Sequence, residues 1–143
     1  MATLEQRFAV LADKDEIREL TARYCFAVAE GDTEGIVELF CPDGIFKIRD
    51  KTFQGTSVLR EFYGEAMGVP PRPFIQNHVI EVNGDEASGR CAVEIRAVQK
   101  GEAYTAAGHY FDRYRRVDGH WRFAERDFRT WHWVRLAQGW AGE

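Results

Sequence analysis

The chain has 143 residues, of which 45% are hydrophobic and 29% charged, with a net charge of −4. This length and composition predict one folded domain spanning residues 1–143 rather than a disordered chain. The acidic balance argues against nucleic acid as a partner, since phosphate binding needs a concentrated positive field.

Other functional classes are excluded by what the sequence lacks. The N-terminus has no signal-peptide pattern and no apolar run is long enough to span a membrane, so a cytoplasmic protein without a membrane partner is expected. Cys25, Cys41 and Cys91 are odd in number, far apart and form no CxxC pair. Neither a disulfide framework nor a metal site is therefore predicted.

The first forty residues predict two helices. Asp13-Lys14-Asp15-Glu16 resembles a capping box, so a helix is predicted to begin there, with Tyr24 on its buried face and Gly31 at its end. Asp32 is predicted to cap a second short helix, which Cys41-Pro42 stops.

After Pro42 the apolar residues recur at every second position, as in a strand. Residues 45–48 and 52–53 predict a short hairpin around Asp50-Lys51, and Thr56 or Ser57 is predicted to cap a third helix. The segment Gly68–Pro73 contains three prolines and predicts a stiff connection.

The second half predicts only strands. They cover residues 74–82, 87–98, 104–117 and 120–133, separated by Asn83-Gly84, Lys100-Gly101 and Asp118-Gly119. These dipeptides tolerate positive φ and favour hairpin turns, so the strands predict an antiparallel meander. Helices followed by long strands indicate an α+β protein, with a curved antiparallel sheet wrapped around the N-terminal helices.

Several short motifs, in this order and spacing, resemble SnoaL-like proteins of the nuclear transport factor 2-like superfamily. They are Glu16-Ile17-Arg18-Glu19-Leu20, Arg23-Tyr24, Gly31-Asp32, Asn77-His78-Val79-Ile80-Glu81, Gly108 with Tyr110 and Asp112, Asp118-Gly119-His120-Trp121, and Glu125-Arg126. The resemblance implies a cone-shaped fold with a central cavity between the first helix and the sheet. It also implies cofactor-independent proton transfer on small apolar molecules: dehydration, dehydrohalogenation, isomerisation or polyketide ring closure.

The usual acid–base pair of this family is missing from its expected positions. In scytalone dehydratase, bile acid dehydratases and hexachlorocyclohexane dehydrochlorinase, an Asp at the end of the first helix is paired with a His on the first long strand. The corresponding positions here are Ala29 and Pro73. Glu30 could substitute if the helix end shifts by one residue, and His78 could substitute if the strand is bulged.

Two further residues are candidates for the chemistry. The resemblance places Tyr24 and Arg126 in the pocket, where a phenol and a guanidinium could polarise a substrate oxygen. A satisfied core tyrosine and a cross-strand surface pair remain the alternatives. Strict alternation along its strand places His78 on the face opposite Ile75 and Asn77, which favours a structural or interface role for it. The predicted ligand-binding residues are Val28, Phe46, Ile75, Asn77, Cys91, Val93, Ile95, Tyr110 and Thr130.

Two function classes follow. The first is an enzyme of the dehydratase, isomerase or cyclase type, with Tyr24 and Arg126 polarising an oxygen and His78 or Glu30 moving the proton. The second is a non-catalytic binding module or partner subunit, favoured by the missing pair. The Trp-rich last strand further predicts a homo-oligomer, a dimer or trimer, formed through the outer face of the sheet.

Overall fold

The computed structural model describes residues 1–65 and 68–142. Helix α1 spans Leu4–Glu30 and begins at a capping box: the Thr3 side chain accepts from Gln6 N, while the Gln6 side chain accepts from Thr3 N. The prediction that this helix begins at Asp13 is therefore wrong. Asp13 lies within the helix, and its carboxylate accepts hydrogen bonds from the distant Arg116 and Trp121 instead.

The end of α1 agrees with the sequence pattern. Gly31 adopts a left-handed conformation with φ 66°, and the Asp32 carboxylate caps helix α2, Thr33–Val37, by accepting from Gly35 N. Strand β1 spans Phe40–Ile48, so the second helix ends earlier than predicted, and Pro42 lies within a strand.

The predicted hairpin and third helix are confirmed. Strand β2, Lys51–Gln54, pairs antiparallel with β1. Helix α3, Thr56–Glu65, follows, and the Thr56 hydroxyl donates to the carbonyl of Pro42. This bond ties the start of α3 to β1.

Four long strands complete the sheet: β3, Arg72–Asn83; β4, Glu86–Gln99; β5, Glu102–Val117; and β6, His120–Arg135. The sheet order is β2-β1-β6-β5-β4-β3, and β1 pairs parallel with β6. The sheet is therefore mixed, not antiparallel throughout as predicted. Hairpin turns set the direction of neighbours in sequence, but no turn links β1 to β6, so the sequence pattern left their pairing open.

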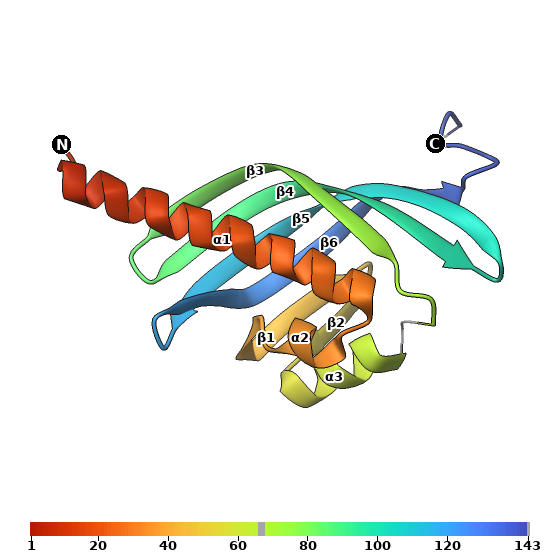
Figure 1. The fold of residues 1–143 in the computed structure, drawn as a ribbon, viewed down its shortest axis with the longest axis horizontal. Helices are drawn as coiled ribbons and strands as arrows, with labels where there is room; N and C mark the ends of the chain where they lie inside the picture. Colours follow the sequence, from red (N-terminus) through yellow and green to blue (C-terminus); the bar gives the residue numbers. More distant parts are fainter. Residues whose placement is uncertain (66–67, 143) are drawn as a thin grey trace.

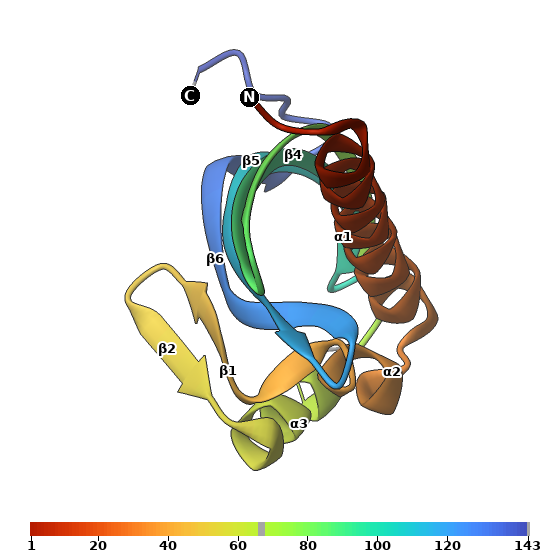
Figure 2. The same ribbon diagram turned by 90° about the vertical axis from the view of Figure 1, so that its left-hand side faces the viewer.

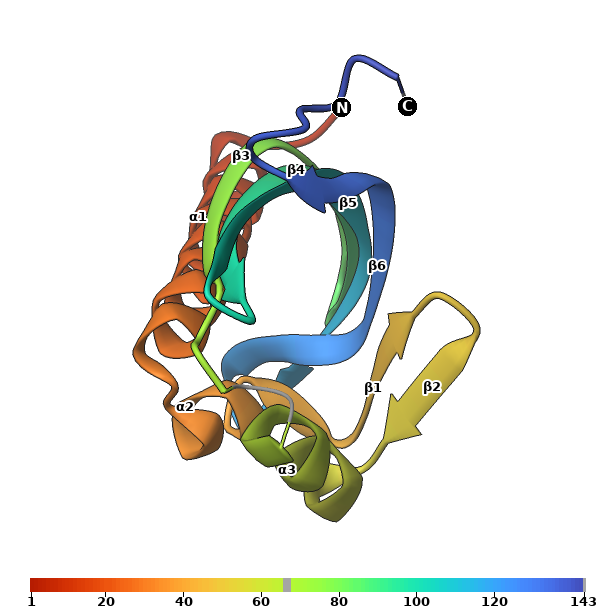
Figure 3. The ribbon, with the colours of Figure 1, turned by 90° about the vertical axis from the view of Figure 1, so that its right-hand side faces the viewer.

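The sheet is curved and unclosed, and α1 lies across it (Figure 1). Figures 2 and 3 show the long strands curling, with α1 alongside β3 and the shorter elements α2, α3, β1 and β2 gathered at one end. The space between α1 and the concave face is occupied by one hydrophobic core. Within the described residues, no helix is long and apolar enough to cross a membrane.

Candidate functional site

An ion pair lies at the centre of this core. Arg126 on β6 and Asp112 on β5 are direct register partners, and both side chains are fully buried. Arg126 Nε donates to Asp112 Oδ1 at 2.9 Å, and Nη2 donates to Oδ2 at 3.1 Å. The Tyr114 hydroxyl donates to the same carboxylate at 2.9 Å. Of the adjacent residues Arg126 and Asp127, it is therefore Arg126 that enters the interior.

Aromatic rings enclose the guanidinium. Its Cζ atom lies 3.6 Å from the ring centroid of Tyr110, 4.4 Å from that of Tyr24 and 4.5 Å from that of Phe123. Burial opposes the charged form, but the Asp112 carboxylate overcomes this and raises the pKa of Arg126 above its ordinary value. The arginine therefore stays charged, and its charge is balanced within the core.

One nitrogen of the Arg126 guanidinium has no hydrogen-bond acceptor. Among the buried side-chain nitrogens and oxygens of the described residues, Nη1 of Arg126 is the one without a hydrogen-bond partner. Nη2 has a second neighbour in the Cys91 thiol, at 3.7 Å. A buried N–H without a partner costs about 1–3 kcal/mol. The arrangement thus retains a charged donor that an oxygen atom of a bound molecule could satisfy.

Tyr24 is paired with a second tyrosine beside this arginine. Its hydroxyl lies 2.8 Å from that of Tyr63 on α3, and the two rings meet edge to face. Burial raises the pKa of Tyr24 to about 12 and that of Tyr63 well above its usual value. Both phenols are therefore neutral proton donors near pH 7. Tyr63 was not predicted as a site residue; its place on the apolar face of α3 was the only signal.

His78 enters the interior, contrary to the alternation argument. The register of β3 against β4 shifts between Gln76 and Val79, and Asn77 has a φ of 59°. This bulge inserts an extra residue, which turns His78 towards α1 and leaves Asn77 exposed. Asn77 is therefore wrongly predicted as a lining residue.

The environment of His78 keeps the imidazole neutral. Its Nε2 lies 2.8 Å from the hydroxyl of Thr21 on α1. Burial lowers the pKa of His78, and the positive charges of Arg126 and Arg18 lower it further. A neutral, half-buried imidazole is suited to accept a proton.

The remaining predicted residues divide into two groups. Glu30 and Thr130 are exposed, so neither lies in the core. Thr130 lies next to a further register shift between β5 and β6, at Ala107/Gly108. The others are buried or, for Ile75, half-buried on the interior face: Val28, Phe46, Ile75, Cys91, Val93, Ile95 and Tyr110.

These interior side chains are closely packed. The Tyr24 ring makes edge-to-face contacts with Tyr110, at a centroid distance of 6.1 Å, and with Phe123, at 5.7 Å. An open groove of about 770 Å³ lies elsewhere, between the first turns of α1 and the β3–β4 turn. Among the described residues, no group of three or more His, Cys, Asp or Glu side chains is arranged to hold a metal ion.

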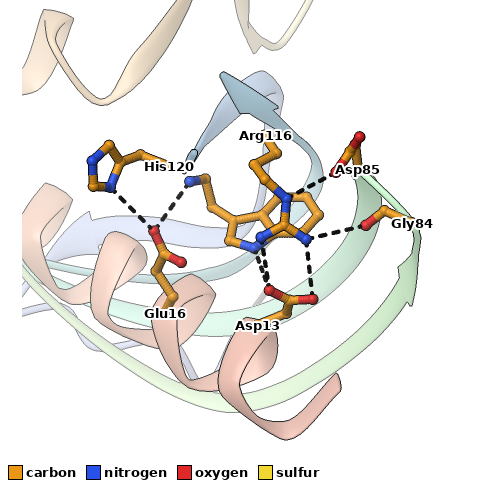
Figure 4. A network of polar contacts seen from close by, with 7 residues as sticks. Asp13, Glu16, Gly84, Asp85, Arg116 and His120 are labelled. Atoms are coloured by element: carbon orange, nitrogen blue, oxygen red, sulfur yellow. Dashed lines mark hydrogen bonds and ion pairs between the residues drawn. The ribbon is translucent and has the colours of Figure 1, made fainter. Parts of the chain in front are cut away.

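A second polar cluster fastens α1 to the strand ends (Figure 4). Arg116 donates to Asp13 and to Asp85, each at 2.9 Å, and the Trp121 indole donates to Asp13 at 3.0 Å. Glu16 accepts from the backbone N–H of Trp121 and lies 3.7 Å from His120 Nδ1. Trp121 is only 2% exposed, so it does not belong to the outer face on which oligomer formation was predicted.

Solved structures that are similar to this chain include the following three. The Mycobacterium tuberculosis protein Rv3472, of unknown function, is 30% identical, with a TM-score of 0.79 over 91% of this chain and 76% of that one. Hexachlorocyclohexane dehydrochlorinase LinA-type3 from Novosphingobium barchaimii LL02 is 19% identical, with a TM-score of 0.82 over 92% and 94% of the two chains. A candidate scytalone dehydratase from Novosphingobium aromaticivorans DSM 12444 is 22% identical, with a TM-score of 0.79 over 87% of each chain.

The comparison with curated protein sequences gave no match. The sequence pattern of the SnoaL-like domain, however, matches residues 9–127, which include α1 from residue 9 onwards, the bulge of β3 and the Arg126–Asp112 pair. The resemblance drawn from the motifs is thereby confirmed, as is the cone-type fold of helices and a curved sheet. The chain belongs to the SnoaL-like domain family.

Proposed function

We propose that the protein is an enzyme of the dehydratase, isomerase or cyclase type, acting on a small hydrophobic molecule by cofactor-independent acid–base chemistry. The observation that carries this proposal is the unsatisfied Nη1 donor of Arg126, buried among aromatic rings. The charge of Arg126 is already balanced by Asp112, so a second anion would have no excess positive charge to meet. The preferred ligand group is thus a neutral oxygen, such as a carbonyl.

The interior residues have complementary roles in this proposal. His78 takes a proton from a carbon next to the carbonyl, and the electron pair moves towards the carbonyl oxygen. Arg126 Nη1 and the Tyr24 hydroxyl stabilise the negative charge that develops there. In an unsaturated ketone the resulting dienolate takes this proton back from His78 at a more distant carbon, which isomerises the substrate. In a substrate with a leaving group on the next carbon, the enolate re-forms the carbonyl and expels that group together with its electron pair.

The solved structures support this reaction class through their names. One is a dehydrochlorinase and another a candidate scytalone dehydratase, and both share the fold. Both names denote eliminations, in which a proton and a leaving group depart from neighbouring carbons. An elimination of this kind needs a base and a group that stabilises charge, as assigned above to His78 and Arg126.

The proposal is tested by hydrogen–deuterium exchange. A panel of small hydrophobic ketones and enones is incubated in D₂O with the wild-type protein, His78→Asn or Tyr24→Phe, and exchange next to the carbonyl is followed by NMR. We expect exchange with the wild type, slowed by about 100-fold or more in each variant. Circular dichroism checks that the variants fold. Equal rates in the wild type and folded His78→Asn would rule out this assignment.

A non-catalytic binding module is the second candidate. It is favoured by the absence of ionisable side chains at Ala29 and Pro73. In that case the same ketones would bind, shown by a rise in melting temperature, but would exchange no faster than in buffer. The two readouts together separate the candidates.

We also propose that the protein forms a homo-oligomer, a dimer or trimer, through the outer face of the sheet. Large apolar side chains are exposed there: Phe74 at 51%, Val79 at 73% and Trp131 at 57%. Light scattering should give a mass of two or three chains at micromolar concentration, and a monomer at every concentration would contradict this.

A further inference from the structure

We infer that Thr21 holds His78 in the tautomer with its proton on Nε2, which leaves Nδ1 as the proton-accepting atom of the ring. Thr21 is thus a positioning residue, at a place in α1 quite separate from Ala29. The assignment of Nδ1 as the catalytic base rests on the proposed function. The tautomer itself does not.

The Thr21 hydroxyl has a single proton to donate. Its Oγ1 atom lies 2.7 Å from the carbonyl oxygen of Arg18 and 2.8 Å from His78 Nε2. A carbonyl oxygen can only accept, so the hydroxyl proton must point to Arg18. The same proton cannot also be donated to His78. The short contact to Nε2 is therefore a hydrogen bond only if Nε2 donates and Thr21 accepts.

The opposite arrangement is unfavourable. If the Thr21 hydroxyl donated to Nε2, two oxygen atoms with only lone pairs between them would face each other at 2.7 Å. Two acceptors at that distance repel each other, whereas an O–H···O bond has this as its usual length. The geometry around Thr21 therefore selects one of the two neutral tautomers.

Both residues are held firmly in place. Thr21 is fully buried in the middle of α1, and a helical threonine commonly bonds the carbonyl three or four residues before it. His78 is turned towards it by the bulge at Asn77. Two local features, a threonine on the inner face of α1 and an extra residue in β3, thus combine to orient one ring.

The charges around His78 come from three elements. Arg18 lies on α1, Asp112 on β5 and Arg126 on β6, and burial together with the two arginines lowers the pKa of His78, while Asp112 opposes them. A threonine oxygen orients the ring as a carboxylate would, but adds no negative charge that would stabilise the imidazolium. Nδ1 therefore remains unprotonated at neutral pH.

The tautomer can be read directly from the ¹⁵N spectrum of histidine-labelled protein at neutral to mildly basic pH. His78→Asn identifies the His78 signals among those of the four histidines. We expect Nε2 to show the shift of a protonated ring nitrogen and slow proton exchange with water, and Nδ1 the shift of a nitrogen with a free lone pair. A proton on Nδ1 in the wild type would overturn the inference without any substitution at Thr21.

A matched pair of variants tests the role of Thr21. Thr21→Val keeps the shape and removes the hydroxyl, so the Nε2 proton should lose its protection from exchange; Thr21→Ser restores the hydroxyl and should restore protection. Protection unchanged in Thr21→Val would contradict the inference. Should the tautomer be as inferred while no substrate exchanges deuterium, the proposed function would fail and the assignment of Thr21 would stand.

Discussion

Removing Arg126 should destabilise the protein, because Asp112 would remain buried without its cation. In Arg126→Met the two hydrogen bonds that Nε and Nη2 donate to Asp112 are lost. The Asp112 carboxylate then keeps the hydrogen bond from the Tyr114 hydroxyl. Breaking one side of a buried pair costs about 3–5 kcal/mol. For a domain of this size, that lowers the melting temperature on the order of 10–20 °C.

The double variant Arg126→Met/Asp112→Asn separates pairing from packing. The asparagine oxygen can still accept from Tyr114, and no buried charge remains, so the double variant should lose clearly less stability than the two single variants summed. Chemical denaturation measures each free energy of unfolding. As a control, the exposed pair Arg23–Glu19 should contribute less than about 1 kcal/mol. Additive losses in the buried pair would refute this reasoning.

Three further predictions concern neighbouring groups. Tyr24→Phe should lower turnover, measured by deuterium exchange, by about 100-fold. It should lower stability, measured by thermal melting, by only about 1 kcal/mol. Adding Tyr63→Phe should recover the stability but not the turnover. The pKa of His78 is lowered by burial, so the wild type should lose stability as the pH falls below about 6.5 and through that lowered value. Melting curves of His78→Asn should show a smaller loss over this interval. Asp13→Ala removes one of the acceptors of Arg116, the one on α1, and amide hydrogen exchange should become faster in residues 4–12 but not in β5.

Much of the fold could be predicted because its signals are local. The turns at Lys100-Gly101 and Asp118-Gly119 and the cap at Asp32 depend on a few adjacent residues, and the structure confirms them. The parallel pairing of β1 with β6 depends on contacts between distant segments, for which the local pattern has no signal. The start of α1 was misplaced because Asp13 has the residue type of a helix cap, yet bonds Arg116.

In the candidate site, too, features with a local signal were predicted and features that depend on contacts between distant segments were not. Arg126 could be proposed from its motif, but its buried pairing with Asp112 on the adjacent strand was not predicted. An acidic residue alternating with Tyr110 and Tyr114 on a buried face was the available signal, since a buried charge must be paired. The predicted orientation of His78 was wrong because strict alternation assumes a regular strand, whereas the bulged strand, left open as the alternative, is the one observed. Asn77, a residue type that tolerates positive φ, was the only indication of a bulge.

The most direct test of the central claim is an experimental structure with a small hydrophobic ketone bound. We expect the ketone to lie in the core, with its oxygen within hydrogen-bonding distance of Arg126 Nη1, about 2.7–3.2 Å, and beside the Tyr24 hydroxyl. The interior aromatic side chains would have to move apart to admit it. A ketone found only in the groove between α1 and the β3–β4 turn, with the packing around Arg126 unchanged, would contradict the claim.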